Sequence, residues 1–224
     1  MRKKQTGKRI GKAVLITGAL ALIMAVGGAS AYFTATDNKT NTWTVGNIDI
    51  QLEEPLYDDA ADERDNITPN KDLTKDPQVK NKGNNDAFVF LKVSIPKADV
   101  KVASQDGSSV SQGMQELFDY TVDSGWALVD KKENAGSNAY VYVYGTSQKC
   151  AALPAGQTTS VFFQDGTITF KNIVEGQGLD GTSLEIPVEA FAIQTADITE
   201  ADTDVPAEVW SVLSGQAGAD ETGR

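Results

Sequence analysis

The sequence has no histidine and only one cysteine among its 224 residues. Histidine is the usual general base near neutral pH and a frequent zinc ligand. Its absence therefore excludes Ser-His and Cys-His nucleophile pairs and zinc sites of the HExxH kind. Catalysis by carboxylates alone stays open, although no recognised pair stands out. The single Cys150 cannot form an internal disulfide; it either pairs between chains or, as we favour, is a small, partly buried residue.

The sequence also lacks an apolar run of the ~20 residues that a membrane-spanning helix needs. The apolar stretch 13–26 follows a segment that has six basic residues and no acid. After it, Ala29-Ser30-Ala31 fits a small-x-small cleavage site, and this three-part layout is typical of a secretory signal peptide. We therefore predict a cleavage site formed by Ala29, Ala31 and Tyr32, with the cut after Ala31. A retained N-terminal anchor is the alternative.

Positive charge is scarce in the rest of the chain. The whole sequence carries a formal charge of −11, and removing the six basic residues before the cleavage site leaves −17. A chain this acidic is repelled by nucleic acid and by anionic lipid. We therefore expect no nucleic-acid partner and no membrane association after cleavage.

The clearest strand pattern lies at residues 88–95. Its apolar residues alternate, so that one face is fully apolar; that face consists of Val89, Leu91, Val93 and Ile95. We expect Pro96 to stop this strand. Such a face is stable only when a second sheet covers it. The last strand, predicted at 182–194, should contribute to the same core the residues Leu184, Ile186 and Val188.

Other short strands are predicted between turn signals, and two short helices at 111–120 and 200–214. The strand ranges are 42–53, 74–80, 121–130, 139–144, 158–163 and 167–170, the last two forming a hairpin around Asp165-Gly166. We expect an all-β fold: a two-sheet antiparallel β-sandwich, jelly-roll-like by preference, with an immunoglobulin-type sandwich as the alternative. The predicted division is a signal peptide at 1–31, an extended segment at 32–44, the sandwich at 45–196, and a helix with a polar tail at 197–224.

Two surface features are candidate binding sites. The predicted loop 54–70 holds five acids that offer weak candidates for a hard cation: Asp58, Asp59, Asp62, Glu63 and Asp65. Their spacing does not match the calcium-loop pattern, so a solvated acidic loop is favoured. The tyrosines at 140, 142 and 144 share one strand face and form either a docking stripe or half-buried packing. No catalytic residue and no cofactor are predicted.

Three blocks of the sequence resemble the TasA/camelysin family: GGASAYFTATDNKTNTWTVGNIDIQL, KDPQVKNKGNNDAFVFLKVSI and EIPVEAFAIQTADI. The resemblance implies export with processing by a SipW-type signal peptidase, a jelly-roll domain, and a secreted or surface protein of Gram-positive bacteria. The best-known members form biofilm matrix fibres, and some relatives carry a metallopeptidase label. The missing histidine argues against that activity here, and no catalytic residue of the family can be carried over.

Three functions therefore compete. We favour a secreted structural protein of the extracellular or biofilm matrix that self-associates into fibres, with donation of segment 32–44 as a strand as the candidate mechanism. The residues expected to help assembly are Tyr32, Phe33 and Trp43. The alternatives are a monomeric cell-surface adhesin or binding module, and a camelysin-like secreted metalloendopeptidase.

The predicted processing can be tested on protein secreted by its host. We expect its N-terminus to be Tyr32, because the basic, apolar and small-residue parts of the signal end at Ala31. Intact-mass spectrometry of the secreted protein measures this directly. A secreted chain that still begins at Met1 would refute it.

Overall fold

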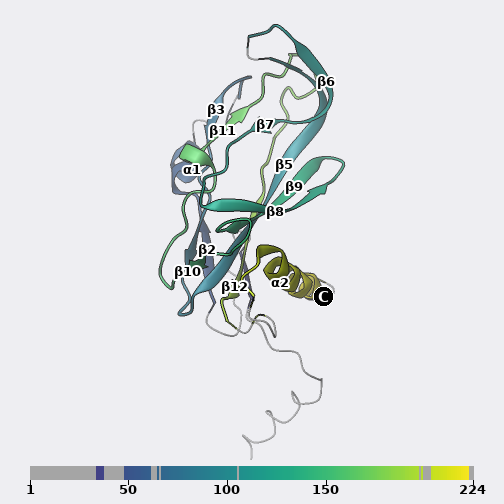
Figure 1. Cartoon of the computed structure of the whole chain (residues 1–224). Helices are drawn as coiled ribbons and strands as arrows, with labels where there is room; N and C mark the ends of the chain where they lie inside the picture. Colours follow the sequence, from purple (N-terminus) through teal and green to yellow (C-terminus); the bar gives the residue numbers. More distant parts are fainter. Residues whose placement is uncertain are drawn as a thin grey trace, which may run out of the picture. The chain divides into compact units, whose positions relative to one another are not determined.

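Strand β5 (Ala87–Ala103) is the central element of the computed structural model (Figure 1). The structure describes residues 34–37, 48–61, 65, 67–104, 106–196, 198 and 203–221. On one side β5 pairs with β12 (Val188–Gln194) and on the other with β9 (Ser137–Tyr144). Every strand pairing of the described chain is antiparallel, as the sequence predicts.

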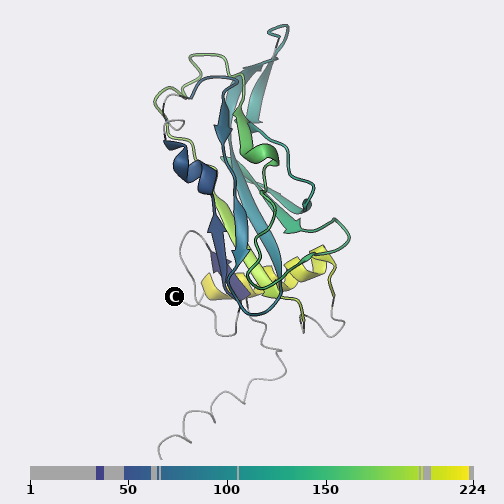
Figure 2. The same cartoon turned by 90° about the vertical axis from the view of Figure 1, so that its left-hand side faces the viewer.

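The strands around β5 form a seven-stranded sheet with the order β1-β12-β5-β9-β8, and two further strands pair with β5 off this path (Figure 2). The path is completed by β1 (Thr34–Asp37) and β8 (Trp126–Glu133). The two off-path strands are β6 (Val110–Glu116) and β10 (Ala152–Leu153). The long β5 can serve all of them because its successive segments pair with different partners.

Two small sheets complete the β structure. One has the order β3-β11-β7, built from Asp72–Thr74, Thr167–Phe170 and Phe118–Asp119. The other pairs β2 (Ile50–Glu53) with β4 (Gln78–Asn81). Residues of both small sheets share one buried cluster with the predicted apolar face of β5, whose members Val89, Leu91, Val93 and Ile95 are fully buried. The prediction that β structure covers this face is therefore confirmed.

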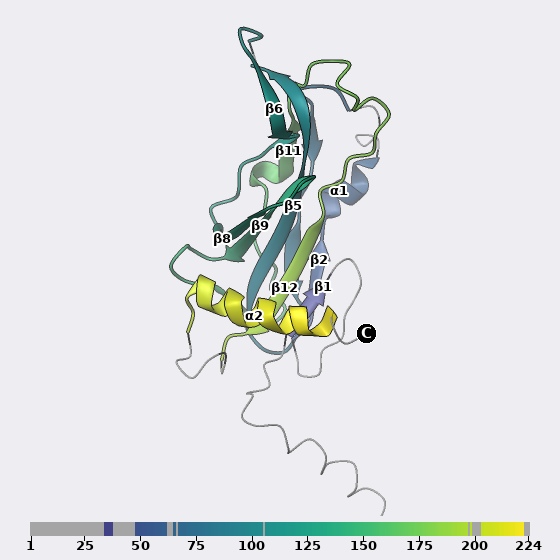
Figure 3. The ribbon, with the colours of Figure 1, turned by 90° about the vertical axis from the view of Figure 1, so that its right-hand side faces the viewer.

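The opposite face of the seven-stranded sheet is also apolar at one end, and helix α2 (Pro206–Glu221) covers it (Figure 3). Trp210 of α2 lies 5.5 Å, between ring centroids, from both Phe90 and Phe191. Helix residues Val209 and Leu213 are fully buried against this second cluster. The predicted C-terminal helix thus exists, and it serves as the cover that the sequence did not assign.

Within the described residues the fold is therefore mostly β, with antiparallel sheets and two α-helices, in agreement with the predicted class. The arrangement is one large curled sheet that packs against two small ones and carries a helix on its other face. No helix among the described residues is long and apolar enough to span a membrane.

Pro96 does not end the central strand, contrary to the prediction. If residue 96 were not proline, its amide would point at the carbonyl of Leu117. In the structure that carbonyl accepts a hydrogen bond from the amide of Lys171 at 3.0 Å. The carbonyl of Pro96 still accepts the amide of Leu117 at 2.9 Å. Since the missing donor leaves no acceptor unpaired, β5 passes through Pro96.

The predicted helix at 111–120 is also wrong, because this segment forms β6 and β7. Met114, Leu117 and Phe118 have helical spacing, but Met114 is exposed while Leu117 and Phe118 are buried. The segment pairs instead with β5 and β11, which lie outside any local sequence window. Tertiary pairing has therefore overridden a weak local pattern.

Two predicted strands are shorter or different in the structure. Residues 158–163 make isolated bridges to Lys80 and Val122 and do not form a hairpin with β11. Asp165 and Gly166 do turn the chain, with φ of 56° and 65°. The last strand begins at Val188, so Leu184 and Ile186 lie in the preceding loop and are partly buried against the main cluster.

The face assignment of β5 can be tested by stability measurements. Replacing Leu91, which is 0% exposed, by alanine should lower the free energy of unfolding by roughly 2–5 kcal/mol, because a cavity remains in the core. The matched control is Leu128→Ala on β8, where Leu128 is 50% exposed and the change should stay within about 0.5 kcal/mol. Urea unfolding measures both. Equal losses in the two variants would contradict the assignment.

Candidate functional site

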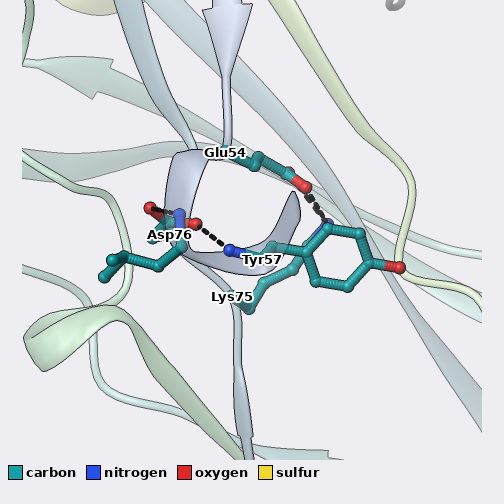
Figure 4. Close-up of polar contacts among 5 residues, drawn as sticks. Glu54, Tyr57, Lys75 and Asp76 are labelled. Carbon is teal, nitrogen blue, oxygen red and sulfur yellow. Dashed lines mark hydrogen bonds and ion pairs between the residues drawn. The ribbon is translucent and has the colours of Figure 1, made fainter. Parts of the chain in front are cut away.

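A buried polar network lies beneath a short helix that the sequence does not predict. The expected loop 54–70 contains helix α1 (Pro55–Asp59), which begins with proline at its first position. Asp76 accepts the amide of Leu56 through Oδ2 and that of Tyr57 through Oδ1, both at 2.9 Å (Figure 4). This carboxylate therefore caps α1 from about 20 residues away, so the capping residue lies outside the local sequence and Pro55 is the one local signal of the helix.

The second carboxylate of the network, Glu54, is 5% exposed and is bonded by Lys75 (Figure 4). The ammonium of Lys75 donates to Oε1 at 2.8 Å and to Oε2 at 3.0 Å. The same ammonium lies 4.8 Å from the ring centroid of Tyr57. Both buried carboxylates are thus already bonded within the protein, and a cation would have to displace Lys75 to reach Glu54.

The backbone of Gly166 packs directly against this network. Its carbonyl accepts the amide of Lys75 at 2.8 Å, and its φ is 65°. A Cβ at this position would come within 3.3 Å of the Cβ of Asp76. The Asp165-Gly166 turn therefore serves the packing of α1 against Asp76, and a glycine is required there for both space and backbone angle.

The predicted acidic candidates do not form a metal site in the described chain. Asp58 and Asp59 are exposed at the end of α1, and Asp65 is exposed in the following loop. Asp62 and Glu63 lie outside the described residues. Among the residues that the structure describes, no three His, Cys, Asp or Glu side chains come together in a way that could hold a metal ion.

An open cleft of about 1260 Å³ lies beside the network and is lined in part by Glu54, Tyr57 and Lys75. Its apolar wall includes Leu52, Leu73, Phe170, Leu184 and Ile186. The segment 173–189 forms one side of it. Polar residues such as Glu175, Asp180 and Glu185 share the lining with this wall, so the cleft suits an extended peptide or a small ligand that has both polar and apolar groups.

The predicted tyrosine row faces the core. Tyr142 is 7% exposed and lies 4.8 Å, between ring centroids, from Phe162. Its hydroxyl lies 3.3 Å from that of Tyr120, and burial raises the pKa of both phenols. Tyr140 and Tyr144 are partly buried against the same cluster. The alternative of half-buried packing is therefore correct, and the docking stripe is not.

Cys150 is buried beneath the α2 side of the sheet at 1% exposure. Burial raises the pKa of its thiol to about 12, so the reactive thiolate is scarce at neutral pH. Its amide donates to the carbonyl of Asp204 at 2.8 Å. This placement fits the small buried residue favoured from the sequence and opposes a bond between chains.

Part of the predicted assembly segment 32–44 is described, and it lies on the sheet edge. Residues Thr34–Asp37 form β1, which pairs antiparallel with β12 from Thr34↔Ile193 to Asp37↔Ala190. The residues Tyr32, Phe33 and Trp43 lie outside the described part of the chain, as do Ala29 and Ala31. The described segment thus takes the position that a donated strand would need, but within its own chain.

The ion pair beneath α1 yields a stability prediction. Lys75→Met should lower the free energy of unfolding by about 3–5 kcal/mol, because Glu54 stays buried without its partner. The double variant Lys75→Met, Glu54→Leu should recover most of that loss. Urea unfolding of both variants measures the effect. A loss below about 1 kcal/mol for the single variant would mean that Glu54 reaches water or another donor.

A scan against protein-family models matches residues 5–132 to the family described as camelysin metallo-endopeptidase. The match covers more than half of the chain and extends from the N-terminal region through β5 into β8. Neither the comparison with curated proteins nor that with solved structures gave a match. The match confirms the resemblance seen in the sequence, and the chain belongs to the camelysin family.

Proposed function

We propose that this chain is a secreted structural protein of the extracellular matrix, which assembles into fibres by exchanging its N-terminal strand between copies. The observation that carries the proposal is the pairing of β1 with β12 at the edge of the large sheet. β1 is four residues long and lies close behind the predicted cleavage site. The jelly-roll topology implied by the resemblance remains a prediction and belongs to this proposal.

Exchange of β1 between two copies of the chain would preserve the pairing of this strand with β12. A strand that leaves its own β12 can form the same four residue pairs with β12 of a neighbour. The main chain supplies the affinity in such a β-strand addition. Raising the protein concentration favours the exchanged form, and processing at Ala31 would release the segment that must move.

The backbone pattern of β12 shows which β1 residues carry this pairing. The amide of Ser94 in β5 donates to the carbonyl of Pro187, which directly precedes β12. Because backbone groups alternate in direction along a strand, those of the odd-numbered residues of β12 also point toward β5. The even-numbered Ala190 and Ala192 therefore face β1, where they are paired with Asp37 and Ala35. Thr34 and Thr36 direct their amides away from β12.

Charge opposes association, because the chain after Ala31 carries −17. Screening salt or acidic pH should therefore promote assembly. The proposed partners are copies of the same chain, together with a signal peptidase that performs the processing. Gram-positive export by a SipW-type system is what family membership suggests.

The cleft beside α1 favours a second candidate, a surface binding module that stays monomeric. Monomer at all concentrations, together with a specific ligand, would decide for it. The third candidate follows from the family description, a metallo-endopeptidase. Peptidase activity of the purified protein that is lost with a chelator would decide for that one.

The proposal predicts that assembly depends on β1 pairing. A chain that begins at Trp43 should form no polymer under conditions in which the chain that begins at Tyr32 sediments as polymer. Ala35→Pro should likewise abolish polymer, because it removes an amide that bonds β12. The matched control is Thr36→Pro, whose missing amide points away from β12, so polymer should remain.

Sedimentation at several salt concentrations measures these four proteins. Equal assembly of the Trp43 and Tyr32 forms, or assembly of neither at any salt or pH, would overturn strand exchange. Equal loss in the two proline variants would show that β1 acts through its general extended shape and not through the pairing with β12.

A further inference from the structure

A hairpin arm carries the two most exposed large hydrophobic residues of the described chain. It consists of β5 from Lys97 to Ala103 paired with β6 from Val110 to Glu116 (Figures 1 and 3). Val110 and Met114 are each 57% exposed, and their spacing places them on the same face of β6. By contrast, the large hydrophobic residues of the rest of β5 and of β12 are buried or partly buried.

Side-chain hydrogen bonds hold described residues at both ends of the arm. At its base, Glu116 Oε1 accepts hydrogen bonds from the side-chain Nδ2 of Asn138 at 2.6 Å and from the hydroxyl of Tyr140 at 2.5 Å. At its tip, Asp106 accepts the hydroxyls of Ser104 and Ser108, both at 2.7 Å. A pre-ordered strand loses little conformational entropy when it binds a partner.

The hydrogen bonds of the arm show which backbone groups of β6 are free. The amide of Leu117 donates to the carbonyl of Pro96, and the amide of Ser104 donates to the carbonyl of Ser109. The backbone groups of the even-numbered residues in this part of β5 therefore point toward β6. Their partners in β6 are Ser111, Gly113 and Gln115. The backbone groups of Val110, Gln112 and Met114 therefore point to the outer edge, where no described strand pairs with them.

This edge lacks the protection that another open edge of the same sheet has. Strand β8 has a bulge between Leu128 and Asp130 in its ladder with β9, and it carries charges from Asp130 to Glu133. By contrast, β6 has neither charge nor proline between Val110 and Gln115. Charged residues and bulges are the usual devices against pairing of edges.

The charge of the arm indicates which partner fits. Residues 97–116 hold two lysines and three acids, a net charge of −1 in a chain of −11. Two copies of this acidic protein therefore bring little net charge together when they approach along the arm.

We propose that two copies of the chain pair antiparallel through their β6 strands, about a two-fold axis at Gln112. In this register Val110 of each copy lies opposite Met114 of the other, so both exposed apolar residues gain a cross-strand partner. The outward backbone groups of Val110, Gln112 and Met114 then bond their counterparts. A register about Gly113 would place Val110 opposite Glu116 instead.

This interface is separate from the exchange of β1 and does not rest on it. The β1 edge lies on β12, whereas β6 pairs with the far part of β5. Together the two contacts would join chains both along and between fibres, but the β6 pair should form whether or not β1 is exchanged.

A cysteine cross-link tests the register in the chain that begins at Tyr32. Gln112→Cys should give a disulfide-linked dimer on mild oxidation, because directly opposed Cα atoms lie about 5.5 Å apart, which a disulfide can span. The matched control is Gln115→Cys in the same strand, whose two copies would lie about 20 Å apart. The native Cys150 is buried and should not contribute. We expect a yield at least roughly tenfold higher for Gln112→Cys.

A lysine on the edge tests the association without a new cysteine. In the Ala35→Pro background, where strand exchange is blocked, analytical ultracentrifugation should show a dimer that Met114→Lys removes, because the charge opposes edge pairing. Leu128→Lys adds the same charge at a similarly exposed site on β8 and should leave the dimer intact.

The proposal is overturned if Gln112→Cys gives no more dimer than Gln115→Cys, or if both lysine variants behave alike. Loss of polymer in Ala35→Pro with continued cross-linking of Gln112→Cys in that background would support it and separate it from strand exchange. Polymer that forms normally while Gln112→Cys fails to cross-link would refute it and leave strand exchange untouched.

Discussion

The structure depends on the alternation of β5. Its odd-numbered side chains from Val89 to Ile95 fill the cluster shared with the small sheets, while Phe88 and Phe90 pack toward α2. The same alternation directs the backbone groups of its even-numbered residues toward β12 and β6. The backbone amide of Lys97, an odd-numbered residue, points toward the β9 side. One strand therefore specifies both cores and both of the sheet edges that we propose for assembly. Because β5 stays extended through Pro96, the arm and the sheet share one continuous backbone.

Features encoded locally could be predicted from the sequence, and features fixed by distant residues could not. The buried face of β5 follows from a period of two within one strand, so Val89, Leu91 and Val93 were placed correctly. Helix α1 was missed because its cap, Asp76, lies about 20 residues away. Strand β6 was missed because its pairing with β5 outweighs the helical spacing of Met114, Leu117 and Phe118. At the candidate site, Pro55 before Leu56 was the one local signal of a helix start.

The buried carboxylates of the described chain are both bonded within the protein. The family description names a metallo-endopeptidase, whereas Glu54 is held by Lys75 and Asp76 by two backbone amides within the described chain. These groups stabilise α1 beside the open cleft. The exposed backbone at β6 and the terminal strand on β12 offer instead the unpaired or exchangeable hydrogen bonds that joining of chains requires. These two edges are the observations on which we base the proposal of assembly.

The central claim is that this acidic chain polymerises through its own strands once residues 1–31 are removed. The most direct measurement is electron microscopy of the purified chain beginning at Tyr32, with light scattering recorded as protein and salt concentrations rise. We predict fibres whose mass increases with both, since salt screens a charge of −17. Particles of monomer size at every concentration of protein and salt would contradict the account.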